Sequence, residues 1–443
     1  METFAKRLMT HLWASWEKLP DVRAANNNRQ YEVADAVMGS FAMFYLQEPS
    51  FDEWQRRMKS KRGRCNAETL FGMKEIPSTG QIRNLLDDQP MDGFTESYDW
   101  LLEQLKASGE YAEYRDVKDT WLIALDGVTY FSSAKVKCEH CLRRKDSQGG
   151  IQYTHSAIVP VIVKPGRKEV LGLPPEFVTN QDGQVKQDCE LNASKRWLTK
   201  HSQRFAAKTA TFLGDDLYAH QPFCAWIAET LQQYFMCVAK PDSHVWLYES
   251  LECLAKVQGI ETHEEEIWTG KRFEIWTYRW VSQVALTGTP DAYKVNWLEL
   301  IVTSKKSGDR LFFNTWVTNH TLEKASLRAL AQAGRARWKV ENESHNILKE
   351  HGYHLEHNFG HGDHNLSAVL FSLNVLSFVA HTVQQLIDHA YKLLRTALVT
   401  RRTLFETLRT AVNWIVFPSW RDLWLFLLDS RDIPLPTELR FSD

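Results

Sequence analysis

Short apolar runs that alternate with helical stretches constrain the fold of the middle of this chain more than any other feature. Trp121 to Leu125 and Thr209 to Leu213 are runs of strand-forming residues, and each is closed by an acidic turn, Asp126-Gly127 and Gly214-Asp215-Asp216 respectively. A helical stretch separates the two runs, and a second one follows from Pro222 to Tyr234. Strands that alternate with helices are typical of an α/β sheet. The sequence therefore predicts an α/β fold with a mixed sheet.

Two further apolar runs extend this sheet. Val128 to Phe131 follows the first acidic turn, and Ile158 to Val163 ends at Pro165-Gly166. Because both runs are short and bounded by turn formers, we expect them to be strands adjacent to Trp121 to Leu125.

Changes in composition and in hydrophobic periodicity along the sequence divide the chain into five parts. Helical periodicity dominates both ends, whereas Trp, Tyr, Val and Thr dominate a segment after the α/β region. The predicted parts are a helical amino-terminal domain (1–115), the first part of the α/β core (116–244), a β-rich insertion (245–320), a helical segment that completes the core (321–362), and a helical carboxy-terminal region (363–443).

The overall charge does not indicate a nucleic-acid partner. The chain has 443 residues and a formal net charge of −2, whereas DNA-binding domains are usually basic. Positive charge is concentrated locally in Arg56 to Arg64, Arg143 to Lys145 and Arg335 to Lys339. Each run alone is best explained as a solvated surface, although together they offer cations for phosphates.

Cysteine usage and hydropathy predict a cytoplasmic protein. Seven cysteines, an odd number scattered over a long chain, do not indicate a disulfide framework. The most apolar stretch, Leu366 to Ala380, is interrupted by polar residues and is too short to span a bilayer. We expect it to be a buried helix.

Three acidic residues are the candidate catalytic groups. Asp126 and Asp215 each follow a predicted strand, and Glu341 lies within a predicted helix. If the two strands are neighbours, the three carboxylates can converge on Mg²⁺ or Mn²⁺, which are hard ions that take oxygen ligands. Taken singly, an acid after a strand is more often a turn residue and a helical glutamate is more often solvated.

The sequence around these acids resembles a known family. Arg337-Trp338-Lys339-Val340-Glu341 is similar to the Arg-Trp-x-Ile-Glu pattern at the third catalytic acid of bacterial insertion-sequence transposases of the insertion-sequence-four type, which carry a Tyr-Arg-Glu-Lys signature. Leu122 to Gly127 resembles that family's first strand and acid, and Phe212 to Tyr218 resembles the second. The resemblance covers roughly residues 120–360, including a β-rich insertion between the second and third acids.

This resemblance implies a ribonuclease-H-like catalytic core that binds Mg²⁺ through Asp126, Asp215 and Glu341. It also implies that Arg337 and Lys349 contact DNA phosphates, that the amino-terminal helices recognise DNA, and that a homodimer assembles on the DNA ends. The alternative explanation for Arg337 and Lys349 is pairing with acids along a helix surface.

The chain departs from the family pattern at two positions. Gly334 stands where the signature tyrosine is expected, and Leu348 stands where its lysine is expected, with Lys349 one residue later. Two assignments also stay open, because Glu343 can replace Glu341 as a ligand and Asp216 can replace Asp215.

Cysteines and histidines suggest a second metal site. Cys138 and Cys141 form a C-x-x-C pair, followed by His155 and Cys189, and tetrahedral Zn²⁺ takes such ligands. Six further histidines lie between His345 and His364, where glycines interrupt the helix. We expect these six to order the loop through hydrogen bonds or to contact DNA phosphates.

The function predicted from these features is cut-and-paste DNA transposition. The enzyme would hydrolyse a phosphodiester at the element's terminal inverted repeats and join the freed 3′-hydroxyl to target DNA. One alternative is a nuclease on the same core. The other is a catalytically silent DNA-binding protein derived from a transposase, which the departures at Gly334 and Leu348 permit.

Overall fold

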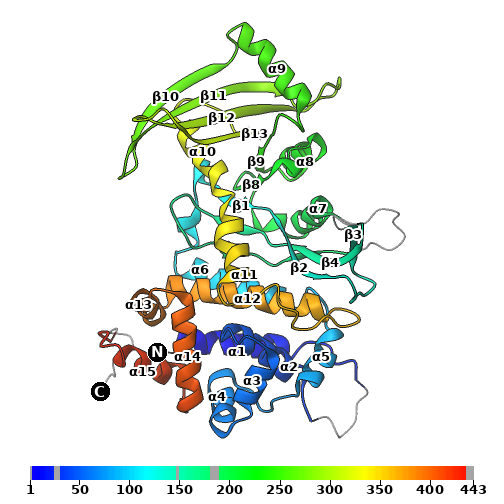
Figure 1. Ribbon diagram of the computed structural model, residues 1–443, viewed down its shortest axis with the longest axis vertical. Helices are drawn as coiled ribbons and strands as arrows, with labels where there is room; N and C mark the ends of the chain where they lie inside the picture. The colour runs from blue at the N-terminus through cyan, green and yellow to red at the C-terminus, as the bar shows by residue number, and fades with distance from the viewer. Residues whose placement is uncertain (1, 24–29, 146–148, 180–188, 436–443) are drawn as a thin grey trace.

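The computed structural model describes residues 2–23, 30–145, 149–179 and 189–435 (Figure 1). The α-helices are α1 (Phe4–Trp16), α2 (Val33–Tyr45), α3 (Phe51–Met58), α4 (Lys61–Phe71), α5 (Thr79–Asp87), α6 (Thr95–Ala107), α7 (Glu190–His201), α8 (Gln221–Ala225), α9 (Val245–Lys256), α10 (Leu327–Ala336), α11 (Asn346–Glu350), α12 (Leu366–Ile387), α13 (His389–Ala397), α14 (Arg401–Trp414) and α15 (Trp420–Asp429). The strands are β1 (Trp121–Ala124), β2 (Gly127–Ser133), β3 (Leu142–Lys145), β4 (Ile151–Ile158), β5 (Val161–Val163), β6 (Leu171–Gly172), β7 (Glu176–Val178), β8 (Ala210–Gly214), β9 (Tyr234–Val238), β10 (Glu261–Trp268), β11 (Phe273–Ala285), β12 (Lys294–Ser304) and β13 (Arg310–Thr318).

The fold is a mixed α/β fold, as the alternating pattern predicts. Its main sheet has nine strands in the order β10-β11-β12-β13-β9-β8-β1-β5-β6. Strand β1 is parallel to β8, and β8 is parallel to β9, whereas the other pairings in this sheet are antiparallel. The ends of β1 and β8 therefore lie at the same edge of the sheet.

The prediction that β1 and β2 are adjacent strands is wrong. After Asp126 the chain leaves the main sheet, and β2 enters a second, four-stranded sheet in which β4 pairs with β2, β3 and β7. The predicted strand Ile158 to Val163 is also divided, because Pro160 stands between β4 and β5 and offers no N–H to a ladder; only β5 pairs with β1. Asp126 thus stands where the chain passes from one sheet to the other.

The segment 245–320 contains a helix that its strand-rich composition did not predict, α9, followed by four strands. These strands extend the main sheet rather than forming a layer of their own, because β13 pairs with β9 in an antiparallel ladder. They form the upper part of the molecule in Figure 1.

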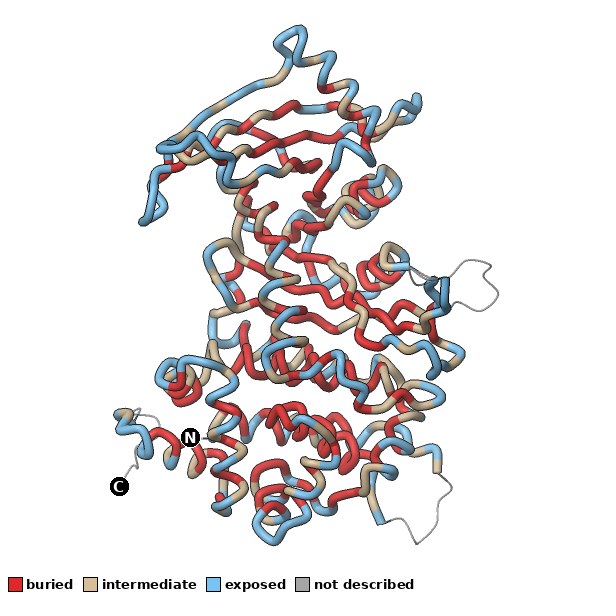
Figure 2. Tube along the Cα trace, viewed as in Figure 1, coloured by how far each residue is buried: buried red, intermediate tan, exposed pale blue. Residues whose placement is uncertain are grey.

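The long apolar helix α12 is buried, as expected, but its 22 residues extend beyond the predicted stretch Leu366 to Ala380, so the prediction that it is too short to span a bilayer is wrong. Among the described residues it is the only helix long and apolar enough to cross a membrane, and its most apolar window lies wholly inside the protein (Figure 2). Tyr98 of α6 donates a hydrogen bond to the Ser372 carbonyl at 2.8 Å, and Tyr45 of α2 donates to Gln384 at 2.6 Å. These buried contacts connect α12 to the amino-terminal helices.

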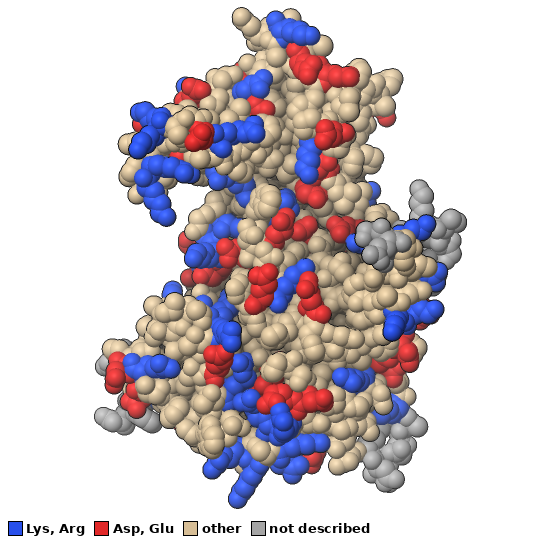
Figure 3. All heavy atoms as spheres, in the orientation of Figure 1, with Lys and Arg blue, Asp and Glu red and all other residues tan. Residues whose placement is uncertain are grey.

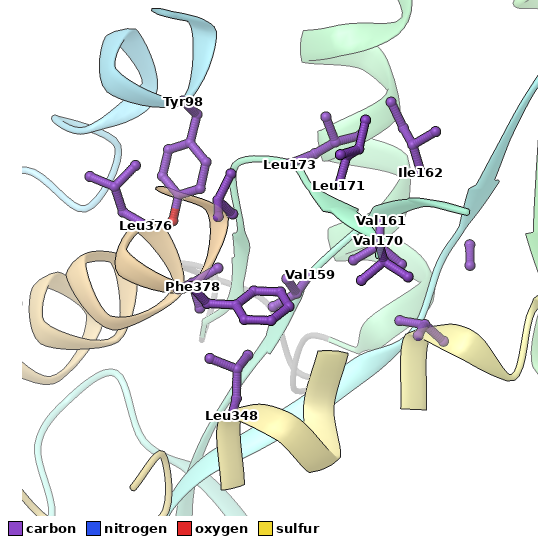
Figure 4. Packing of buried hydrophobic residues seen from close by; sticks show 14 of the residues in the cluster. Tyr98, Val159, Val161, Ile162, Val170, Leu171, Leu173, Leu348, Leu376 and Phe378 are labelled. Atoms are coloured by element: carbon purple, nitrogen blue, oxygen red, sulfur yellow. The ribbon is translucent and has the colours of Figure 1, made fainter. Parts of the chain in front are cut away.

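On its other side α12 packs against the main sheet and the helix that follows the third acid. Figure 4 shows Phe378 of α12 beside Val159, with Leu348 of α11 close by, whereas Leu376 lies toward Tyr98. The approach at β6 is close, since a Cβ on Gly172 would lie 2.6 Å from Val379. Helix α12 therefore forms the common core between the sheet and the helical ends of the chain.

Candidate active site and metal centre

The register of β1 and β8 places two of the predicted acids at one edge of the main sheet. Ala124 lies opposite Leu213, and the Leu125 amide donates to the Leu213 carbonyl at 2.9 Å. Asp126 and Asp215 each stand two residues beyond that pair. Because the strands are parallel and in register, both aspartates leave the sheet at the same level.

The electrostatic environment of Asp126 indicates that acids gather around it. Burial is the largest cause that raises the pKa of Asp126, to about 7, and the positive charge of Arg337 opposes this shift. The negative charges of Glu341, Glu190 and Asp215 raise the pKa further. Both other predicted acids therefore lie near enough to act on Asp126, and Glu190 joins them.

Glu341 begins a π-helical turn, Glu341–His345, between α10 and α11. The Arg337 guanidinium donates to its carboxylate at 2.8 Å, and the Arg337 side chain is only 8% exposed. Single π-helical turns occur frequently at functional sites. Arg337 thus compensates the acids from inside the protein, which leaves the prediction that it contacts DNA phosphates untested.

Glu190 is an acid close to Asp126 that the sequence did not predict as part of the candidate site. It begins α7, and a Cβ on Gly127 would lie 2.4 Å from the Glu190 carboxyl carbon. Burial, followed by the charge of Asp215, raises the pKa of Glu190, whereas Arg144 lowers it. The only local signal was an acid at the start of a predicted helix, which is common on protein surfaces.

The neighbouring aspartates Asp215 and Asp216 have different roles. Asp216 accepts a hydrogen bond from the Lys240 amide at 2.7 Å and another from the Ser243 hydroxyl, and its carboxylate lies 3.3 Å from the His244 imidazole. Asp216 therefore fixes the connection after β9. The charge of Asp215 acts on Asp126, and the Asp215 carboxylate also accepts a hydrogen bond from the Leu217 amide at 2.9 Å.

His345 borders Asp126 from the end of the π-helical turn. Its Nδ1 is 3.6 Å from an Asp126 carboxylate oxygen, beyond hydrogen-bond distance. Burial lowers the pKa of His345 to about 4, so the imidazole is neutral at pH 7. Its Nε2 is buried and has no hydrogen-bond partner among the described residues. A neutral imidazole with a spare polar atom therefore lies beside the acids.

The two departures from the family pattern have structural explanations. Leu348 is fully buried against the α12 core (Figure 4), so a lysine cannot occupy that position without burying its charge. Lys349 instead pairs with Glu356 at 2.9 Å. At Gly334, a Cβ would lie 2.6 Å from Trp316 and 3.0 Å from Met236. No larger residue fits between α10 and the sheet.

We expect Gly334→Ala to destabilise the protein by about 1–3 kcal/mol, because the added methyl group overlaps the Trp316 ring. Gly80→Ala is the matched control, since its Cβ would meet nothing within 4 Å in helix α5. That variant should gain about 0.4–1 kcal/mol. Urea unfolding of both variants measures the difference. Equal stabilities would show that α10 does not pack against β13 as closely as described.

A separate group of four side chains has the composition of a metal site. Cys138, Cys141, His155 and His361 each direct one ligand atom toward the others, all within 4.8 Å; we call these four the Cys/His group. Three of the four were predicted as zinc ligands. The prediction of Cys189 as the fourth ligand is wrong, because Cys189 is exposed, precedes α7 and does not belong to the group.

His361 is instead the fourth member. It comes from the histidine-rich loop between α11 and α12, which we expected to form hydrogen bonds or contact DNA. One such hydrogen bond is present, between His361 Nδ1 and the Gly362 carbonyl at 2.7 Å. For His361 the prediction is therefore incomplete, because the other ring nitrogen faces the cysteines.

Figure 3 shows acidic side chains near the middle of the molecule, in the region where β1, β8 and α11 lie, with basic side chains beside them. Acidic side chains can hold metal ions, and the cations beside them can hold the phosphates that such ions bind.

In comparisons with known proteins, no family model matches this chain, and no curated protein matches it.

Proposed function

We propose that this protein is a metal-dependent DNA transposase with a ribonuclease-H-like core. The observation that carries the proposal is the register of β1 with β8, which brings Asp126 and Asp215 to one sheet edge beside Glu341. The order β6-β5-β1-β8-β9 supports it, because a ribonuclease-H-like sheet has an antiparallel hairpin on one side of its central strand and parallel strands on the other.

The donor set suits Mg²⁺ or Mn²⁺. Asp126, Asp215, Glu341 and Glu190 offer only carboxylate oxygens, and burial makes an ionised Asp126 costly until a cation approaches. When bound, two such ions activate the attacking oxygen and stabilise the leaving oxygen of a phosphodiester. A pKa raised by burial and by neighbouring acids is common among residues of functional sites.

The remaining groups of the site have supporting roles in the proposal. Arg337 neutralises part of the carboxylate charge and so allows the acids to stay close together. The imidazole of His345 is neutral, so it can accept a hydrogen bond from a water or a substrate hydroxyl beside Asp126, or donate one to it. In the hydrolytic step water attacks phosphorus and the bond to the 3′-oxygen breaks; the freed 3′-hydroxyl then attacks a phosphorus of target DNA.

The proposed partner is double-stranded DNA, and the amino-terminal helices offer a basic surface for it. The exposed cations of α3, α4 and their connection are Arg56, Lys59, Lys61, Arg62 and Arg64. Figure 3 shows basic side chains gathered at the lower end of this face, where α3 and α4 lie. Cations in such a cluster bind phosphates without reading sequence, and they make binding salt-dependent. The proposal places the protein in the bacterial cytoplasm.

The direct test uses the full chain with a supercoiled plasmid that carries the genomic segments flanking the coding sequence. We expect Mg²⁺- or Mn²⁺-dependent cleavage at the outer ends of short inverted repeats and integration into a second plasmid. Cleavage without integration would favour a nuclease. Binding without cleavage under any divalent ion would favour a silent DNA-binding protein and overturn the proposal.

Two adjacent variants test the assignment of the second acid. Asp215→Asn should lower cleavage by about 10²-fold, because one metal ligand is lost, with little change in stability. Asp216→Asn should instead lower stability by about 1–2 kcal/mol, since it loses hydrogen bonds to the segment after β9. Cleavage rates and urea unfolding distinguish them. The reverse outcome would make Asp216 the ligand.

A further inference from the structure

We propose that the Cys/His group is a tetrahedral zinc centre that fastens the loop entering α12 to the sheet containing β2 and β4. The proposal is independent of the DNA chemistry, because none of the four side chains belongs to the carboxylate site. It rests on the distances among the ligand atoms, on the local structure that positions them, and on the place of His361 in the chain.

Five of the six distances among the ligand atoms are close to those of a tetrahedron around zinc, and the sixth is within 4.8 Å. With Zn–S bonds of about 2.3 Å and Zn–N bonds of about 2.0–2.1 Å, tetrahedral angles require S–S, S–N and N–N separations of about 3.8, 3.6 and 3.3 Å. The two sulfurs are 3.8 Å apart, and the two imidazole Nε2 atoms are 3.1 Å apart. Three sulfur-to-nitrogen distances in the group are 3.5, 3.3 and 3.5 Å.

Local structure positions the sulfurs and the first imidazole. Cys138 and Cys141 lie in the turn between β2 and β3, where the Cys141 amide donates to the Cys138 carbonyl at 3.3 Å. The Cys138 amide lies 3.4 Å from the Cys141 sulfur, and such an N–H donor stabilises a thiolate. His155 lies on β4 in register with Phe131 of β2. Sheet pairing therefore brings three ligands together.

The fourth ligand is oriented by its own backbone. The hydrogen bond between His361 Nδ1 and the Gly362 carbonyl holds the ring so that Nε2 faces the sulfurs. Metal-bound histidines almost always make such a bond through their other ring nitrogen. Two sulfurs and two imidazole nitrogens form a closed set that suits Zn²⁺ and does not suit Mg²⁺.

The position of His361 gives the centre its role. The loop between α11 and α12 is held at one end by Asp87 of α5, whose carboxylate accepts hydrogen bonds from the Asp363 and Leu366 amides at 2.8 and 2.9 Å. Zinc would hold the same loop to the sheet that begins at Gly127, directly after Asp126. A bound zinc ion would therefore join the segment that follows Glu341 to strand β2, which follows Asp126.

Metal content of the purified full chain tests the proposal. We expect about one zinc per chain after purification without added metal, and loss to about a tenth or less in Cys141→Ser and His361→Ala. Cys189→Ser is the matched control and should keep its zinc, because Cys189 lies outside the group. His361→Cys should also keep zinc, since three sulfurs and one imidazole are a common ligand set for this ion.

Cobalt substitution tests the geometry in the wild-type chain and does not depend on how the variants fold. After zinc is chelated, added Co²⁺ should give the intense visible bands of a tetrahedral site with sulfur ligands. A wild-type chain that carries no zinc and gives no such bands would overturn the proposal, as would zinc retained in both ligand variants.

The proposed role has its own measurement. Chelation should raise amide hydrogen exchange at least about tenfold in residues 351–365, while exchange in β11 and β12 stays unchanged. Unchanged exchange in the loop would show that the ion does not fasten it. The metal-content and hydrogen-exchange measurements are made without DNA, so their outcomes do not depend on the proposed transposase activity.

Discussion

Asp126→Asn is expected to lower metal-dependent DNA cleavage by about 10³-fold and to leave binding of the DNA ends unchanged. Asparagine has nearly the same shape as aspartate but carries no charge. It therefore removes the carboxylate that interacts electrostatically with the neighbouring acids. The loss corresponds to about 4 kcal/mol of transition-state stabilisation. Single-turnover cleavage and a gel-shift titration on the same end sequence measure the two effects.

The same variant should make the metal-free protein more stable at alkaline pH. The pKa of Asp126 in the folded protein is about 7, above its ordinary value of 3.8, so its protonated form favours folding. This contribution is complete below about pH 4 and is lost as the pH rises through 7. The advantage of Asp126→Asn over the wild type should therefore grow by about 2–3 kcal/mol from about pH 5 to about pH 8.

Asp116→Asn provides the control for the cleavage measurement. Burial also raises the pKa of Asp116, but this residue precedes β1 at the opposite end of the strand. It should cleave DNA at the wild-type rate. If Asp126→Asn cleaved normally, Asp126 would have no catalytic role. If its stability advantage were the same at both pH values, the acid would already be ionised in the folded protein at the lower one.

The parts of the site that the sequence predicted are those determined by local patterns. A strand that ends in an acid fixes where that acid leaves the sheet, so the apolar runs placed Asp126 and Asp215 at strand ends, and the resemblance to transposases selected them as candidates. Their mutual register was not contained in those runs. It follows from the parallel pairing of β1 with β8, which the intervening helix α7 makes possible.

The residues that the sequence missed are brought to their sites only by tertiary contacts. Glu190 reaches the acids because Gly127 lacks a side chain and leaves room for its carboxyl group. His361 is 220 residues from Cys141 and meets it through the packing of the α12 loop on the second sheet. Cys189, by contrast, is nearer in sequence but lies outside the group. Spacing along the chain therefore misled the ligand assignment.

The strand order could not be predicted for a related reason. The runs that form β1 and β2 are separated only by Leu125 and Asp126, a spacing that is typical of a hairpin. At Asp126 the chain instead changes sheets, and its carbonyl accepts a hydrogen bond from the Val159 amide at 3.3 Å. A residue at such a crossing is held from two sides, which suits a side chain that must keep its position.

Glu341→Gln is the second variant with a large expected effect, a loss of about 10³-fold in cleavage. Its carboxylate is joined to the buried guanidinium of Arg337 and its charge reaches Asp126. Glu343→Gln is the matched control, because residues two positions apart on a helix point in different directions. We expect that variant to cleave within about threefold of the wild-type rate, as is usual for a change outside the site.

Comparison of the two glutamates also separates loss of metal from loss of structure. In Glu341→Gln the amide oxygen still accepts a hydrogen bond from Arg337, so the fold should be retained while affinity for Mn²⁺ falls. Calorimetric titration with Mn²⁺ and urea unfolding distinguish these effects. If Glu343→Gln lost cleavage and Glu341→Gln did not, the third ligand would be Glu343, and the π-helical turn would have to rotate before the metal binds.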